Sequence, residues 1–318
     1  MKHIQFSRPN LKADNEDLIA IKEIIDNGWF CESKYIKQLE NRFKEITGNK
    51  YAIPCSSCTQ GLVIAFKAAD IKNKDVAVQS FTWPSILFAL ESTNNRPLWC
   101  DINENSWLLD NVPSFVFREI GAIVITDTFG NQAEFETDLP LIVDAAHGYN
   151  LPKLGKRGLI EVISFSFTKK ITGMQGGCLL TDDYDVYVKA WELIRLSCKM
   201  LEIEAYYILK QMNIYEEQEV ICNRIINKYR DLIKIPYKEQ SITTSNHSVF
   251  AILFENSKIR DTIKNSFEKN NIEVKIYYEP LERGLPKTED IFSRILALPV
   301  YESMESEVER ICNLINNI

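Results

Sequence analysis

The chain has 318 residues, a hydrophobic content of 45%, a formal charge of −7 and a pI near 5.3. A chain of this length can bury a large core, and we expect one large domain and one smaller one. The excess of acidic side chains argues against nucleic acid or an acidic membrane surface as a partner, because those ligands need clustered Lys and Arg. Small anions remain possible ligands, since helix N-termini bind them without net positive charge.

The N-terminal sequence and the cysteines predict a cytoplasmic protein. Residues 1–17 lack the apolar core of a signal peptide, and no later apolar run is long enough to span a membrane. The eight cysteines are spread along the chain, several in apolar runs, which is typical of free buried thiols. Cys55 and Cys58 form one close pair that allows a redox or zinc interpretation, but no second pair with zinc-like spacing follows.

The first part of the chain alternates between predicted helices and buried strands. We expect helices at 16–27, 35–46 and 59–70, and strands at 75–81, 96–101, 121–130, 139–146, 161–167 and 177–183. Strands this continuously apolar are buried on both faces, which favours a mostly parallel sheet flanked by helices. The connection near 130–139 has about the minimum length of a parallel crossover that contains a helix, so we expect a reduced crossover there.

The second part of the chain predicts a smaller mixed domain. The pattern is helical from about 186 to 233, and then predicts a strand at 247–255, a helix at 259–270, a strand at 272–278 and a helix at 306–317. We therefore expect a large α/β domain at 1–234, which includes the N-terminal and interdomain helices, and a small α+β domain at 235–318.

Ligands of parallel α/β sheets collect where strands end and helices begin, and four such junctions hold unusual residues. The first is PCSSCTQG (54–61), where small residues including Cys58 and Thr59 leave backbone N–H groups open at a helix start. These groups suit a phosphate, although Ser57 or Thr59 as a plain N-cap remains an alternative. In the second, QSFTWPS (79–85), Trp83 either covers the core or stacks on a flat ring.

The third junction is LIVDAAHG (141–148), where Asp144 ends a buried strand. A buried carboxylate needs a partner, and a protonated pyridine nitrogen would serve. The alternatives are that Asp144 caps a turn and that His147 is a satisfied polar core residue. In the fourth, ISFSFTKKITGMQGG (163–177), an amine of Lys169 held in an apolar pocket would be nucleophilic toward an aldehyde, and Lys170 would be a surface charge. Together the four junctions match the groups of pyridoxal 5′-phosphate (PLP).

The order of these motifs resembles the DegT/DnrJ/StrS family of nucleotide-sugar aminotransferases, which have the aspartate aminotransferase-like fold of PLP-dependent transferases. The resemblance runs over nearly the whole chain. It begins with FSRPNL…IDNGWF and continues through IKQLENRFKEITGNKYAIPCSSCTQGL, VQSFTWPS, DAAHGYNLPKLGKRG, SFSFTKKITGMQGG, MLEIEAYYILKQM and LALPVYESMESEVERI.

The resemblance implies roles for individual residues. Lys169 matches the Schiff-base lysine, and Asp144 matches the carboxylate on the pyridine nitrogen. His147 matches the residue near the ring hydroxyl and Trp83 the stacking aromatic, while the phosphate contacts fall on Cys58, Thr59 and Ser164.

The resemblance also implies a function. An amino acid, with L-glutamate as the expected donor, would give its amino group to a nucleotide-linked keto sugar in the synthesis of surface polysaccharide, lipopolysaccharide or deoxyamino sugars. A homodimer with its active site at the subunit interface is expected. Two alternatives stay open: a PLP enzyme of other chemistry, such as a dehydratase, a lyase or a non-sugar transaminase, and an inactive regulatory or partner protein.

The chain departs from the family pattern at several points. The segment at 184–200 is shorter, and Ser197-Cys198-Lys199 replaces an Asn-x-Arg motif that reaches the partner subunit. Lys170 stands where Asn is usual, and Gln175 replaces a glutamate. Ser33-Lys34 replaces a Gly-Pro and Tyr277 a histidine. Most of these changes concern sugar and intersubunit contacts rather than the cofactor contacts.

Overall fold

The fold is taken from a computed structural model, which describes residues 3–9, 11, 14–113, 120–241 and 244–318. Its centre is a seven-stranded sheet in the order β1-β7-β6-β5-β4-β2-β3. The strands are β1 (Tyr51–Cys55), β2 (Asp75–Gln79), β3 (Arg96–Cys100), β4 (Ile120–Thr126), β5 (Leu141–Ala145), β6 (Ile160–Ser164) and β7 (Gly177–Thr181). Only β7 runs against its neighbours, so the sheet is mostly parallel, as predicted.

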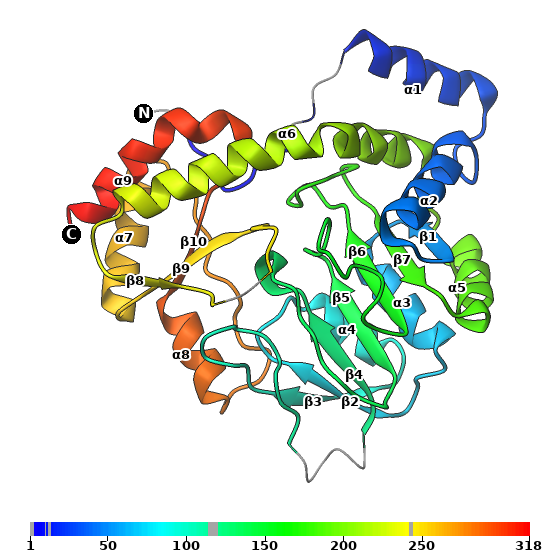
Figure 1. The fold of residues 1–318 in the computed structure, drawn as a ribbon, viewed down its shortest axis with the longest axis horizontal. Coiled ribbons are helices and arrows are strands. Elements are labelled where there is room, and N and C mark those ends of the chain that lie inside the picture. Colours follow the sequence, from blue (N-terminus) through cyan, green and yellow to red (C-terminus); the bar gives the residue numbers. More distant parts are fainter. Residues whose placement is uncertain (1–2, 10, 12–13, 114–119, 242–243) are drawn as a thin grey trace.

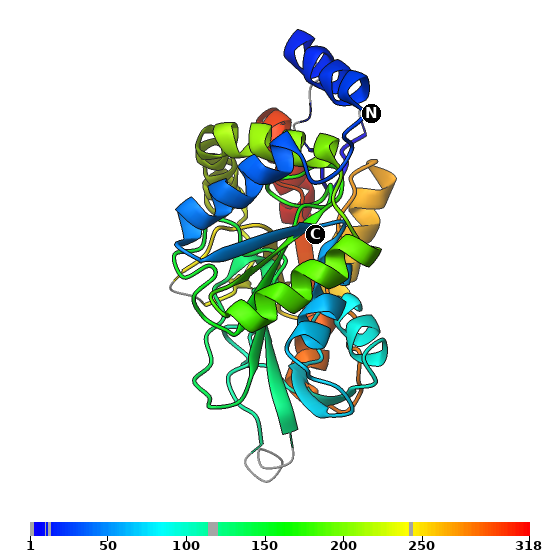
Figure 2. The same cartoon turned by 90° about the vertical axis from the view of Figure 1, so that its right-hand side faces the viewer.

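Helices cover both faces of this sheet (Figures 1 and 2). One face packs on α3 (Cys58–Ala68), α4 (Ser85–Glu91) and α5 (Tyr184–Ser197), and the other on α2 (Lys34–Thr47) and α6 (Glu202–Leu232). The strands alternate apolar side chains between the two helical layers, because successive side chains of a strand point to opposite faces. Val76 and Val78 pack on the first layer, whereas Ala77 packs on the second.

The C-terminal part of the chain, called the C-terminal layer below, is built around a three-stranded sheet in the order β10-β9-β8. This layer contains β8 (Tyr237–Glu239), β9 (Phe250–Phe254), α7 (Ser257–Lys269), α8 (Pro286–Arg294), β10 (Ile295–Leu298), a 3-10 helix (Glu302–Glu307) and α9 (Val308–Asn316). A hydrophobic cluster joins it to the large sheet, with Phe81 and Phe129 on one side and Tyr278 and Leu253 on the other. The domain boundary at 234/235 stays a prediction.

The first residues of the chain return to the C-terminal layer. Ile4 is fully buried and pairs with Ile272, with Ile4 N donating to Asn271 O at 2.9 Å and Glu273 N donating to Ile4 O at 2.8 Å. Helix α1 (Asn15–Asn27) stands off from the body beside α6, as Figure 1 shows. None of the helices within the described ranges combines the length and apolar character needed to cross a membrane.

Most elements predicted from the sequence are present, and one strand prediction is wrong. The prediction of a reduced crossover is confirmed, since the connection between β4 and β5 contains a 3-10 turn (Thr128–Gly130) in place of an α-helix. The strand expected at 272–278 does not form: Ile272 pairs with Ile4, but Lys275 pairs with Ala297 on another segment. Because the segment changes partner within three residues, no continuous ladder develops. Helices α4 and α8 and strands β8 and β10 were not predicted.

Candidate active site

A cavity of about 560 Å³ lies where five strands of the large sheet end. Four of its wall residues, Cys58, Thr126, Asp144 and Ser164, stand at the carboxyl ends of parallel strands or just beyond them. Parallel sheets with helices on both faces leave a crevice at this edge, where ligands bind. The volume falls in the range of small-molecule sites, which is about 300–1,000 Å³.

All seven residues predicted for the site line this one cavity. They are Cys58, Thr59, Trp83, Asp144, His147, Ser164 and Lys169. They come from four separate segments, so the fold brings together residues up to 111 positions apart, from 58 to 169. Their proximity is a feature of the structure, but their individual roles are proposals.

Lys169 is carried by an ordered loop between β6 and β7. Phe165 N donates to Gly176 O at 2.9 Å, and Thr172 Oγ1 donates to Phe165 O at 2.9 Å, so both ends of the loop are closed. Lys169 N donates to Ser166 O at 2.9 Å, which forms a turn directly before the amine-bearing side chain. Burial of its amine lowers the pKa of Lys169 to about 8, although the nearby Asp144 opposes the shift. A lysine of lowered pKa is a better nucleophile near neutral pH.

Lys170 faces a different environment, and the prediction that it is a surface charge is wrong. Its side chain is 12% exposed, and its Nζ lies 3.8 Å from Glu219 Oε1 and 6.0 Å from the centre of the Tyr215 ring. Both lysines line a smaller neighbouring cavity of about 80 Å³, but only Lys169 also lines the large one. The geometry therefore favours Lys169 for chemistry at the large cavity.

Asp144 is a buried carboxylate with few partners. Its Oδ1 accepts from Ala146 N at 3.1 Å, and the Cys58 thiol lies 3.9 Å away. Burial raises the pKa of Asp144 to about 6, because the backbone hydrogen bond and Lys169 only partly offset the loss of solvent. Burial and the neighbouring Asp144 also raise the pKa of the Cys58 thiol well above its ordinary value, so the thiol stays protonated. A cation that donates a hydrogen bond to Asp144 would stabilise its ionised form.

The start of α3 and the start of β7 are packed very closely at the cavity wall. A Cβ atom on Gly177 would lie 2.7 Å from the backbone nitrogen of Cys58, so only glycine fits there. Ser57 caps α3 and accepts from Gln60 N at 3.2 Å. The prediction that Ser57 is the N-cap of α3 is therefore confirmed. The start of the helix still faces the cavity, and its positive end favours an anion there.

Aromatic side chains form the outer wall of the cavity. Trp83 is 57% exposed, and its ring contacts Tyr278 edge-on at 6.4 Å between ring centres. Trp83 lines the cavity and does not cover the core, which leaves the stacking role open to it. Tyr278 and the N-terminal residues Gln5, Phe6 and Ser7 also line the cavity, and the sequence predicted no site role for them.

A buried ionic network beneath the site was also missed. Arg157 Nη2 donates to Asp127 Oδ2 at 2.9 Å and to Glu161 Oε2 at 2.6 Å, and all three side chains are at most 4% exposed. Burial raises the pKa of Asp127 even though Arg157 opposes the shift. Asp127 N donates to Asp144 O at 3.0 Å, so the network supports the strand end that carries Asp144. The partners are distant in sequence, and only the i, i+4 spacing of Arg157 and Glu161 could have suggested it.

The comparison with family models decides the class of the chain. The model of the DegT/DnrJ/EryC1/StrS aminotransferase family matches residues 11–316. The chain belongs to this family. Membership of the DegT/DnrJ/EryC1/StrS family confirms both the predicted resemblance and the predicted enzyme class, a PLP-dependent transaminase.

Solved structures confirm the predicted fold. DesI, solved in the presence of its TDP-sugar product, superposes with a TM-score of 0.90 at 22% identity and covers 100% of this chain and 93% of its own. PseC from Helicobacter pylori, an aminotransferase of pseudoaminic acid biosynthesis, gives 0.89 at 19% identity, with 99% of each chain covered. Spr1654 from Streptococcus pneumoniae in its PLP-form gives 0.86 at 16% identity, again with 99% of each chain covered. At these identities the similarity establishes the DegT/DnrJ/EryC1/StrS fold and leaves the substrate to be determined.

Proposed function

We propose that the chain transfers an amino group from an amino acid, with L-glutamate as the expected donor, to a nucleotide-linked keto sugar. The observation that carries the proposal is that the Lys169 amine and the Asp144 carboxylate line one cavity large enough for a cofactor and part of a substrate. Family membership and the sugar product named for DesI support a nucleotide-sugar substrate. We expect the product to enter surface polysaccharide or deoxyamino sugars, and the reaction to take place in the cytoplasm.

The residues at the cavity fit PLP as the cofactor. Asp144 is a buried acceptor to which no cation among the described residues is hydrogen-bonded, although the charge of Lys169 acts on it, and a protonated ring nitrogen would suit it. The start of α3 suits a phosphate, with Cys58, Thr59 and Ser164 as the proposed contacts. When bound, this cofactor supplies an aldehyde that exchanges amines and a ring that withdraws electrons from the substrate carbon.

The side chains of this chain would then divide the work. Lys169 would hold the cofactor covalently, and its released amine would move a proton at the substrate carbon, a task suited to a pKa of about 8. Asp144 would keep the ring nitrogen protonated. His147 would orient the ring near its hydroxyl, and Trp83 would stack on its face.

Purified protein should be incubated with PLP, L-glutamate and a panel of keto-sugar nucleotides. Formation of 2-oxoglutarate together with an amino sugar would support the proposal. A product without amino transfer would instead indicate a lyase or dehydratase. A bound but unreactive cofactor would indicate a regulatory or partner protein.

The ionisation of Asp144 predicts a pH dependence of cofactor binding. Because the pKa of Asp144 is about 6, its carboxyl is charged above and neutral below that pH. At pH 8 we expect Asp144→Asn to weaken PLP binding by about tenfold to a hundredfold, the range of a hydrogen bond to a charged group. Below pH 6 the difference between the two proteins should shrink, since the wild-type carboxyl is then also neutral. Spectroscopic titration of both proteins from pH 5 to 8 measures this, and a constant ratio would contradict the assignment.

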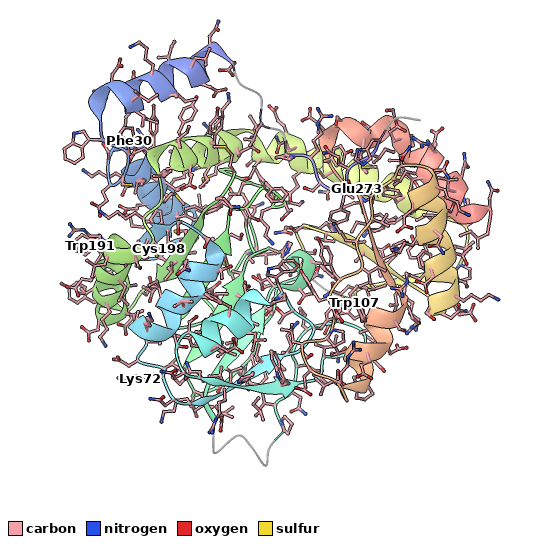
Figure 3. The ribbon with its side chains drawn as sticks, turned by 180° about the vertical axis from the view of Figure 1, so that it is seen from behind. Phe30, Lys72, Trp107, Trp191, Cys198 and Glu273 are labelled. Atoms are coloured by element: carbon pink, nitrogen blue, oxygen red, sulfur yellow. The ribbon has the colours of Figure 1, made fainter. Side chains whose placement is uncertain are left out.

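We also propose a homodimer, supported by an exposed apolar surface. Leu18 and Ile19 on α1 are each 61% exposed, Trp29 is 67% exposed and Leu196 is 86% exposed. Figure 3 shows Phe30 and Trp191 on this same side of the molecule, away from the layer that carries Glu273. Large apolar side chains gathered on one side are typical of a protein interface. Helix α1 is fixed to α6 by Lys210, which donates to Asp14 and Asp17 at 2.7 Å each, so its apolar face is held outward.

Sedimentation at working concentration tests the dimer. We expect a dimer for the natural chain and a shift toward monomer for Leu18→Glu combined with Ile19→Glu. A fully active monomer would remove the proposal.

A further inference from the structure

A loop of the C-terminal layer contacts the proposed catalytic residues through a chain of hydrogen bonds. Ser248, which precedes β9, has its Oγ 2.7 Å from His147 Nδ1. On the other side of the same ring, His147 Nε2 lies 2.8 Å from Lys169 Nζ. The imidazole is therefore held between a hydroxyl from the C-terminal layer and the amine of the lysine loop.

The backbone on both sides of this contact is clamped by Asn246. Its Nδ2 donates to His147 O at 2.6 Å and to Tyr149 O at 2.7 Å, and its Oδ1 accepts from Ser248 N at 2.9 Å. Asn246 is only 4% exposed, and its own N donates to Gly130 O at 2.9 Å. A buried amide with this many partners has one orientation, so Ser248 is presented to His147 at a fixed position.

The proton positions follow from the chemistry of the two partners. A lysine ammonium has three donors and no acceptor, so His147 Nε2 must accept from Lys169. Burial and the nearby Lys169 lower the pKa of His147 well below its ordinary value, so the ring is neutral and carries one N–H. That N–H must be on Nδ1, where Ser248 Oγ accepts it.

We propose that Ser248 is a positioning residue for Lys169, acting through His147: its hydroxyl accepts the Nδ1–H and so holds the ring in the orientation that turns Nε2 toward the amine. Its consequence for turnover rests on the proposed function. The protonation state of His147 does not rest on the proposed function, because it is a property of the protein without cofactor.

The tautomer can be measured directly, because the chain contains three histidines, His3, His147 and His247. Full-length protein without cofactor, labelled with ¹⁵N in its imidazoles, should be studied by NMR at about pH 7, below the Lys169 pKa of about 8. His3→Gln and His247→Gln assign the signals. We expect Nδ1 of His147 to be protonated and Nε2 to be bare. Ser248→Ala removes the acceptor of the Nδ1–H, so we expect its proton signal to move upfield and to exchange faster with water, whereas Ser248→Thr, which keeps the hydroxyl, should leave both unchanged.

Kinetics give the second readout, with Ser241→Ala as the matched control because it changes an exposed serine of the neighbouring loop. We expect Ser248→Ala to lower kcat about tenfold with KM unchanged, and Ser248→Thr to restore it, since a small misplacement of a reacting group costs this much or more. A wild-type His147 that is protonated on Nε2, or a Ser248→Ala protein with an unchanged Nδ1–H signal and kcat, would overturn the proposal. If the tautomer is as expected but the wild-type protein does not transaminate, the proposed function fails and the positioning by Ser248 stands.

Discussion

Replacing Lys169 by alanine should abolish both transamination and the covalent capture of PLP. The amine at 169 lines the cavity that also contains Asp144, and its pKa of about 8 makes it the available nucleophile and proton carrier there. We expect turnover to fall by at least about a thousandfold, in the range for loss of a general acid–base group. Borohydride reduction followed by peptide mapping should find the cofactor on Lys169 in the natural chain and no adduct in the variant.

The adjacent lysine provides the matched control. Lys170→Met removes an amine one residue away, which lies near Glu219 and does not line the large cavity. We expect this variant to keep the cofactor adduct and most of its turnover. If Lys170→Met loses the adduct while Lys169→Ala keeps it, the covalent role moves to Lys170.

Replacing Arg157 by methionine should give the largest loss of stability. Asp127 and Glu161 are fully buried, and Arg157 is the cation that hydrogen-bonds to both. Leaving buried carboxylates without their cation costs about 3–5 kcal/mol. In a chain of this length we expect the melting temperature to fall by about 5 to 10 °C, which scanning calorimetry measures.

Two further variants test whether buried charge is the cause. Arg96→Met breaks a two-bond contact with Asp75, but Arg96 is 77% exposed, so we expect a loss below about 1 kcal/mol. Adding Asp127→Asn and Glu161→Gln to the Arg157→Met protein neutralises both carboxylates. This triple variant should recover much of the stability lost in Arg157→Met. Equal losses for Arg157→Met and Arg96→Met would show that the network contributes no more than a surface pair.

The central sheet and the meeting of the strand-end residues at one cavity could be predicted from the sequence because their signals are local, whereas Ser164 was added only by the family resemblance. Each buried strand is a short apolar run, and the site residues stand at the end of such a run, as Asp144 and Ser164 do, or within a few residues after it. Parallel strands place their carboxyl ends at one edge, so the residues were expected to meet. The glycine at 177 is explained only by the structure, through the close approach of Cys58.

The parts that could not be predicted depend on contacts between distant segments. Ser248 approaches His147 across 101 positions, and no pattern near Ser248 indicates this contact. Lys170 has the sequence context of a solvated turn, yet α6 covers it with Tyr215 and Glu219. The strand predicted at 272–278 has the right composition, but its two backbone partners, Ile4 and Ala297, belong to different segments. Local propensity does not carry that information.

The pairing of Ile4 with Ile272 affects how the protein is completed during synthesis on the ribosome. Gln5, Phe6 and Ser7 line the cavity, but the segment to which Ile4 bonds, Asn271 to Glu273, is made more than 260 residues later. All seven strands of the large sheet lie within residues 51–181 and are made before this segment, whereas the part of the cavity wall next to Ile4 can take its place only after the segment emerges. A nascent chain stalled before residue 271 would hold the lysine loop and lack this part of the wall.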